Sequence, residues 1–152
     1  MKHINFARLF ITISSLFLFL SITAFFILAT SLGFPLDYDQ SISVVKQITP
    51  VFIGYIGQSA YYLISKSSEL LDISGVRIKL LYILSISPFL IFSSLFCAII
   101  FAFSASNFPD NPPGEGMSFS QLTDWFTIIL GLFAATASIV TAWIFQGAKS
   151  ND

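Results

Sequence analysis

Apolar residues fill four long runs of this chain, and most polar residues are gathered in the segments between them. The runs cover residues 9–32, 42–64, 80–103 and 122–145. Each is longer than the roughly 20 apolar residues that an α-helix needs to cross the hydrocarbon core of a bilayer. Because a bilayer offers no water to backbone N–H and C=O groups, such a segment has to be helical. The pattern predicts an all-α integral membrane protein with four transmembrane helices in an up-down bundle.

The second run differs from the others because polar and small residues form a line along one side of its predicted helix. At about 100° per residue, these positions fall within roughly 60° of one direction. The opposite side carries Val45, Phe52 and Ile56. Polar groups face acyl chains only at a high cost, so the line is predicted to face another helix, a partner subunit or water. This polar line consists of Lys46, Gln47, Pro50, Gly54, Gly57, Gln58 and Tyr61.

The composition is typical of a membrane domain. Only 10% of the 152 residues are charged and 55% are hydrophobic, whereas soluble domains contain about 25% charged residues. The polar segments are too short for a soluble domain, so residues 1–152 are predicted to form a single transmembrane domain. The first run follows basic residues, as a signal peptide does, but it exceeds the roughly 7–15 apolar residues of a signal. An uncleaved helix is therefore favoured.

Basic residues are confined to alternate segments between the runs, apart from Lys46. They are Lys2 and Arg8 before the first run, Lys66, Arg77 and Lys79 after the second, and Lys149 after the fourth. Segments 33–40 and 104–121 contain no lysine or arginine. Short loops rich in lysine and arginine stay on the cytoplasmic side of a membrane. The distribution predicts a multi-pass protein of the inner or plasma membrane with both termini in the cytoplasm.

The chain lacks the residue combinations on which catalysis and metal binding depend. His3 is the only histidine, Cys97 is the only cysteine, and neither an HExxH pattern nor a glycine-rich phosphate loop is present. Acid–base, nucleophilic and metal chemistry all need a cluster of such groups. We therefore expect no enzymatic activity, no cofactor and no metal. With a net charge of −1 and no basic patch, direct binding of nucleic acid is not expected either.

Two charged residues lie inside the runs, at similar distances from the same predicted membrane face. They are Lys46 in the second run and Asp124 in the fourth. Ionisable groups in spanning segments are costly, so one hypothesis is that the two form an ion pair. The alternatives are that the lysine extends to the membrane surface and that the dipole at the start of the last helix stabilises the carboxylate.

Small residues in the fourth run recur at spacings that place them on one side of a helix. This seam consists of Gly131, Ala135, Ser138 and Ala142. Small side chains allow a second helix to approach closely. The residues leave open whether that helix is the second helix of the same chain or belongs to a neighbouring subunit. Just before the run, Ser118 and Gln121 have the spacing of a capping box, which predicts the start of the last helix.

Three functions are compatible with these features. The first is a homo-oligomeric pore, or another protein that alters membrane permeability, in which several copies turn the polar line toward a common axis. Several copies are needed because one four-helix bundle has no room for an aqueous lumen. The alternative is a membrane sensor or anchor subunit with a cytoplasmic protein partner, in which the line is interior packing. A small transporter is a weaker alternative, since no carboxylate lies at mid-depth.

The architecture resembles that of small four-helix proteins that serve as membrane arms of bacterial antiphage defence systems such as Kiwa. In those systems the membrane protein acts together with a cytoplasmic effector. The resemblance is one of architecture alone, since no motif of this chain carries it. It implies a role in antiviral defence with a cytoplasmic partner.

Overall fold

Four long helices make up nearly all of the described part of the chain. The computed structural model describes residues 2–65, 75–107 and 116–146, and no strand occurs within these ranges. The prediction of an all-helical protein is confirmed. The helices are α1 (Lys2–Ala29), α2 (Tyr38–Ser65), α3 (Gly75–Ser106) and α4 (Phe119–Gln146), with a short 3₁₀ turn, η1 (Thr30–Leu32), after α1.

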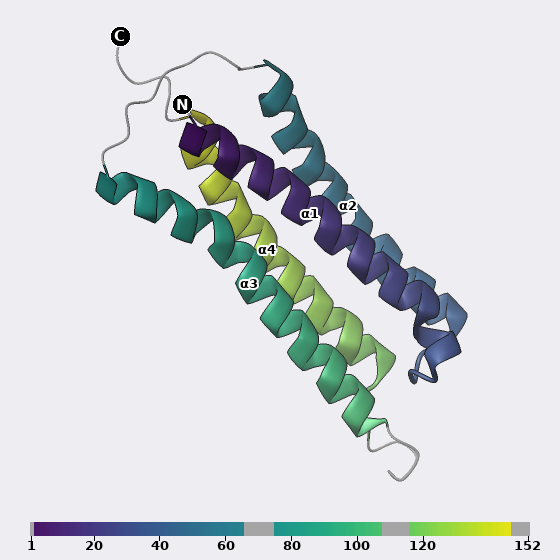
Figure 1. Ribbon diagram of the computed structural model, residues 1–152. Helices are drawn as coiled ribbons and strands as arrows, with labels where there is room; N and C mark the ends of the chain where they lie inside the picture. The colour runs from purple at the N-terminus through teal and green to yellow at the C-terminus, as the bar shows by residue number, and fades with distance from the viewer. Residues whose placement is uncertain (1, 66–74, 108–115, 147–152) are drawn as a thin grey trace.

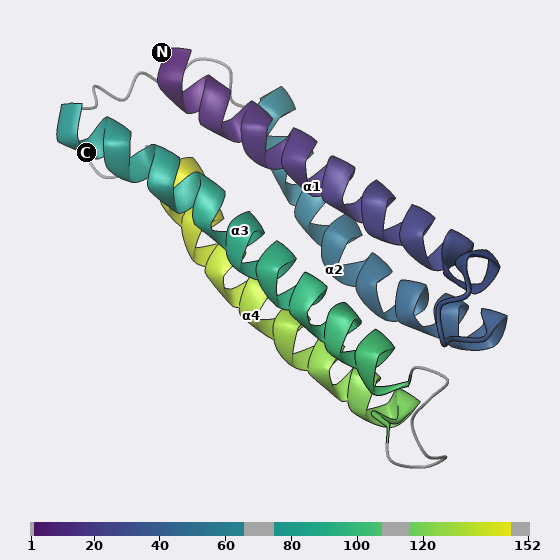
Figure 2. The same cartoon turned by 60° about the horizontal axis from the view of Figure 1, so that its bottom comes forward.

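The helices form two antiparallel pairs that lie side by side (Figures 1 and 2). The first pair is α1 with α2 and the second is α3 with α4. The two pairs are in contact through α1 with α3 and through α2 with α4. α1 runs parallel to α3, and α2 runs parallel to α4. The start of α1 and the end of α4 therefore lie at one end of the bundle, while α2 and α4 begin at the other. This is the up-down arrangement predicted from the sequence.

Two of the helices begin with the same reciprocal capping box. The Ser118 N–H donates to Gln121 Oε1 at 2.9 Å, and the Gln121 N–H donates to Ser118 Oγ at 3.2 Å. This confirms the predicted start of α4. Before α2, the Asp37 N–H donates to Gln40 Oε1 at 3.1 Å, and the Gln40 N–H donates to Asp37 Oδ1 at 2.7 Å. Each box satisfies backbone donors that a helix start leaves unpaired.

Aromatic rings from all four helices fill the centre of the bundle. The ring of Phe133 in α4 lies 5.3 Å from that of Phe52 in α2 and 5.0 Å from that of Phe92 in α3. Phe26 of α1 and Phe126 of α4 meet at 6.0 Å. All five side chains are buried, and such pairs contribute about 0.5–1.5 kcal/mol each beyond their buried area. Packed aromatic rings therefore fill the central part of a single bundle.

Three of the helices are long and apolar enough to cross a membrane. The candidate spans are Leu9–Leu32, Tyr82–Ser106 and Phe119–Ile139, so the chain is a small multi-pass membrane protein. The predicted second span, 42–64, is not among them, although α2 is as long as α1 and α4, at 28 residues each. Length is therefore not what sets α2 apart. The residues of the polar line make α2 less apolar than the other three helices.

Candidate functional site

The polar line of α2 lies on the outside of the bundle. The core side of α2 carries Val44, Ile48 and Phe52, none of which is more than 1% exposed. The helical period turns the polar line away from these positions. Its exposed members are Lys46, Pro50, Gly54, Gly57, Gln58 and Tyr61. The sensor interpretation assumed that the polar line packs inside its own bundle. Most of the line instead faces whatever surrounds the protein.

Gln47 is half-buried and bonds from the polar line to α4. Its Nε2 donates to the carbonyl of Thr123 at 3.2 Å and to Oγ1 of Thr127. Further along α2, the buried Tyr55 hydroxyl donates to the carbonyl of Ala137 at 2.9 Å. Such bonds between membrane helices contribute about 0.6 kcal/mol on average and up to about 2 kcal/mol. Together the two contacts set the register of α2 against α4.

The role of Gln47 agrees with the structural alternative considered from the sequence, namely a glutamine that bonds across the bundle. Tyr55 was missed. Its neighbours in the sequence suggest ordinary aromatic packing, because Phe52 and Ile56 are apolar. The spacing of three residues between Phe52 and Tyr55 could have identified this residue, because it places both side chains on the same side of the helix.

Lys46 and Asp124 do not form the predicted ion pair. Both residues belong to the described part of the chain, both are exposed, and no ion pair joins them there. Similar depth along two neighbouring helices is not enough for a contact, because the rotation of each helix decides where its side chain points. Asp124 lies in the first turns of α4, where the helix dipole favours a carboxylate. Lys46 has a long stem that lets its amine reach the membrane surface.

The small-residue seam of α4 is also on the outside. Gly131, Ala135 and Ser138 are exposed, whereas Phe133 and Ala137 form the core side of the same helix. A Cβ built at Gly131 would meet no atom within 4 Å. The seam therefore lies beside the packed contact between α2 and α4 rather than in it. The side chain of Ala142, the remaining member, is outside the described residues.

The polar line and the seam border the same side of the bundle. Gln47 belongs to the polar line and bonds to Thr127 of α4. Gly131 follows Thr127 by one helical turn, so the seam continues along the strip of α4 that Gln47 touches. We call this surface the α2–α4 face. Its exposed members are Pro50, Gly54, Gly57 and Gln58 of α2 and Gly131, Ala135 and Ser138 of α4.

The α2–α4 face differs chemically from the rest of the outer surface. Elsewhere the bundle exposes large apolar side chains, such as Phe17, Leu90 and Phe101 at 72%, 62% and 75%. Those side chains suit acyl chains, whereas the α2–α4 face offers glycines, small side chains and a carboxamide. Cβ atoms built at Gly54 and Gly57 also meet nothing within 4 Å. The glycines thus make no close packing contact with the described part of the chain, and they leave room for another helix.

The exposed side chains of the α2–α4 face are small or uncharged. Across the described residues, no three His, Cys, Asp or Glu side chains gather to hold a metal ion. What the face can do is pack closely against a second helix or line a hydrated path.

Comparison with protein-family models, with curated proteins and with solved structures finds no match to this chain. Its function is therefore inferred from the surfaces that the bundle presents.

Proposed function

We propose that the chain is a four-span membrane protein whose copies assemble through the α2–α4 face and form a pore. The observation that carries this proposal is the exposure of Gln58, Gly54 and Gly57 on the outside of a membrane bundle. The two glycines allow another helix to approach closely, and the carboxamide of Gln58 is poorly solvated by acyl chains. Contact with other copies, or with water between them, removes that cost. No single bundle provides such a path, because aromatic rings fill its central part.

This proposal makes α2 the fourth membrane span, although it is the least apolar of the helices. It packs along α1 and α4, so it occupies the same layer as two candidate spans. Its 28 residues measure about 42 Å at 1.5 Å per residue, which exceeds the roughly 30 Å of a hydrocarbon core. Four crossings place both ends of the chain on one side. The basic residues of the alternate segments support the proposal that this side is the cytoplasm.

In a ring of copies, the α2–α4 faces would supply the lining of the conduit. Gln58 offers an amide group, and Pro50 has no N–H to donate to the carbonyl of Lys46, four residues earlier. Amides and released carbonyls replace part of the hydration shell of an ion in a pore. Asp37 and Asp39 are exposed at the start of α2, where their charge favours cations at the mouth.

The alternative is a membrane sensor or anchor that assembles without conducting and holds a cytoplasmic effector. The small side chains of the seam support it, because helices joined at Gly131 and Ala135 can pack too closely to leave a lumen. A transporter is less favoured, since Asp124 lies near the start of α4 rather than at mid-depth.

Reconstitution into liposomes tests the proposal. The wild-type protein is expected to be an oligomer by light scattering in detergent and to release a trapped cation from vesicles. Gly54→Leu should dissociate the oligomer and reduce flux at least tenfold. It should leave the single bundle folded, because a side chain at Gly54 meets nothing within 4 Å. The matched control is Ala98→Leu on the exposed surface of α3, which should change neither property.

A monomeric wild-type protein would exclude any conduit between copies, and so would flux that Gly54→Leu leaves unchanged. An oligomer that is dissociated by Gly54→Leu but conducts nothing, and that retains one soluble protein from the cytoplasm of its host, would establish the sensor instead.

A further inference from the structure

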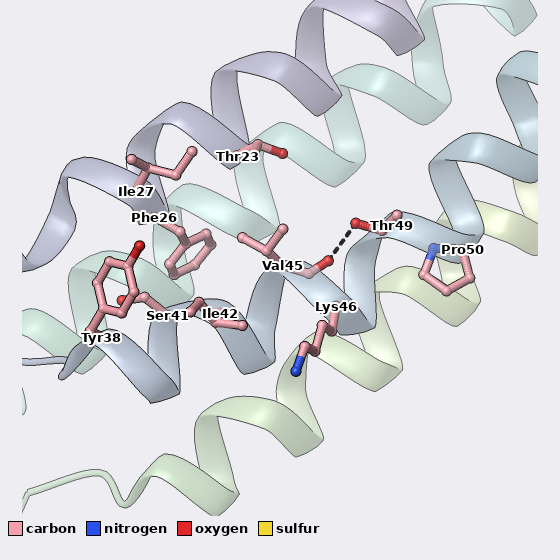
Figure 3. Close-up of a pocket in the computed structure, with 10 residues that line it drawn as sticks. All are labelled: Thr23, Phe26, Ile27, Tyr38, Ser41, Ile42, Val45, Lys46, Thr49 and Pro50. Carbon is pink, nitrogen blue, oxygen red and sulfur yellow. Dashed lines mark hydrogen bonds between the residues drawn. The ribbon is translucent and has the colours of Figure 1, made fainter.

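A cavity of about 290 Å³ opens between α1 and α2, at the end of the bundle where α2 begins (Figure 3). Its walls are mainly apolar and include Phe26 and Ile27 of α1 and Val45 of α2. Phe26 and Ile27 lie near the end of the span Leu9–Leu32. The cavity therefore lies in the part of the candidate span that is nearer its end, on the side where α2 begins. Its size is close to the lower limit of about 300 Å³ for small-molecule sites, which suits part of a lipid.

Ser41 distinguishes the cavity from a plain apolar groove. This serine lines the cavity and is 2% exposed, yet its Oγ has no hydrogen-bond partner in the described structure. Other hydroxyls of the helices donate to carbonyls of the preceding turn, as Ser15 does to Ile11 and Thr49 to Val45. Buried polar groups are nearly always paired, and an unpaired one is costly. The Ser41 hydroxyl thus indicates a hydrogen bond to a group from outside the chain.

Lys46 brings a positive charge to the rim of the same cavity. Its side chain is exposed and borders the cavity. Figure 3 shows its amino nitrogen directed away from the apolar side chains. Lysines at this depth bury their stem along apolar surface and hold the amine near the headgroups. The cavity therefore combines apolar walls, one buried hydroxyl and a cation at its rim.

We propose that the cavity binds one phospholipid from the leaflet that meets the start of α2. An acyl chain lies against Ile27, Ile42 and Val45, an ester carbonyl accepts a hydrogen bond from Ser41, and the phosphate pairs with Lys46. Three parts of one amphipathic molecule thereby meet three kinds of side chain. A water molecule would satisfy Ser41 but would not fill the apolar walls. The cavity lies between α1 and α2 and shares only Pro50 with the α2–α4 face, so the lipid contacts proposed here use none of the residues on which assembly depends.

Native mass spectrometry of the delipidated protein tests this site, with phosphatidylglycerol and a diacylglycerol of the same chains as probes. The wild type is expected to retain one phosphatidylglycerol about fivefold more tightly than the diacylglycerol, which corresponds to about 1 kcal/mol for one basic group near a membrane surface. Lys46→Met should abolish that difference. Lys79→Met, which removes an exposed lysine near the start of α3 at the other end of the bundle, should preserve it.

Two further variants probe the hydroxyl and the walls. Ser41→Ala should raise the melting temperature of the lipid-free protein, because it removes an unpaired buried group, and should reduce the rise that phosphatidylglycerol produces. Ile27→Trp should exclude the lipid while keeping the helical content, because Ile27 is 58% exposed and a larger ring extends outward over the cavity.

Equal binding of the two probes, equal losses in Lys46→Met and Lys79→Met, or a retained lipid in Ile27→Trp would overturn the site. Binding of many lipids without a distinct first one would show only general solvation by the bilayer. Gly54→Leu, the variant aimed at assembly, should retain the lipid, so failure of the pore proposal and failure of this site are distinguishable.

Discussion

α2 and α3 both contribute side chains to the same core, yet their outer surfaces suit different surroundings. α3 exposes large apolar side chains, among them Ile83 at 64% and Leu90 at 62%. On α2 the exposed positions include Gly54, Gly57 and Gln58. Acyl chains solvate the α3 surface without cost, whereas they would leave the carboxamide of Gln58 without a hydrogen-bond partner. The difference indicates that the two helices do not meet the same medium.

The prolines of these helices show the same contrast. Pro88 of α3 is buried and Pro50 of α2 is exposed. Each deprives the carbonyl four residues earlier of its helical donor. In α3, that carbonyl belongs to Leu84, and the Ser87 hydroxyl donates to it at 3.4 Å. In α2, it belongs to Lys46, and no side chain of the described part of the chain donates to it. In α3 a side chain thus replaces the missing donor, whereas in α2 no side chain of the described residues does so.

The largest expected effect comes from placing the same charge on both outer surfaces. Leu90→Lys should cost about 3–4 kcal/mol of insertion free energy, since the lysine replaces leucine on a lipid-facing surface. Gly54→Lys should cost markedly less, because Gly54 lies on a face that we place against protein or water. Membrane insertion scored by glycosylation mapping measures both variants. Equal losses would mean that the outer side of α2 also faces acyl chains.

A smaller effect is expected where α2 and α3 share one support. Phe133 of α4 contacts both Phe52 and Phe92, so Phe133→Ala should loosen both helices together. We expect a loss of about 3 kcal/mol, the lower end for buried phenylalanines, because detergent also surrounds the unfolded ring with apolar groups. Unfolding in detergent with increasing denaturing surfactant measures it. Phe17→Ala, on the outer surface of α1 at 72% exposure, is the control and should change stability little.

The smallest effect is expected at the polar contact between α2 and α4. Tyr55→Phe removes the hydroxyl that donates to Ala137 and leaves that carbonyl with its helical partner. The expected loss is about 0.6–1 kcal/mol, measured by the same unfolding assay. Tyr38→Phe, which alters a 61% exposed tyrosine at the start of α2, should be neutral. A loss from Tyr55→Phe no larger than that of the control would mean that rings alone set the register.

Features that depend on neighbours in the chain were predictable from the sequence. Ser118 and Gln121 cap α4 as their spacing indicates, because a capping box involves only residues three apart. The same rule applied to Asp37 and Gln40 would have found the start of α2 at residue 38 rather than 42. It was missed because both residues were considered only as part of a polar loop.

Features that depend on helix rotation were predictable only in part. The periodicity placed Phe52 opposite the polar line, and Phe52 is indeed in the core. The bundle contains no Lys46–Asp124 pair among its described residues, because depth along two helices says nothing about their relative rotation. For the same reason the partner of Gln47 on α4 was not foreseen.

By itself, the sequence determined that this chain builds long apolar helices of a membrane protein, because the length of an apolar run is a property of consecutive residues. It also determined that polar and small residues form one line on α2 and another on α4. Only the tertiary structure decided that both lines lie outside the core and border one face. That outcome depends on how the rings of Phe26, Phe52, Phe92 and Phe133 pack, because these rings come from all four helices and their packing constrains how each helix is rotated.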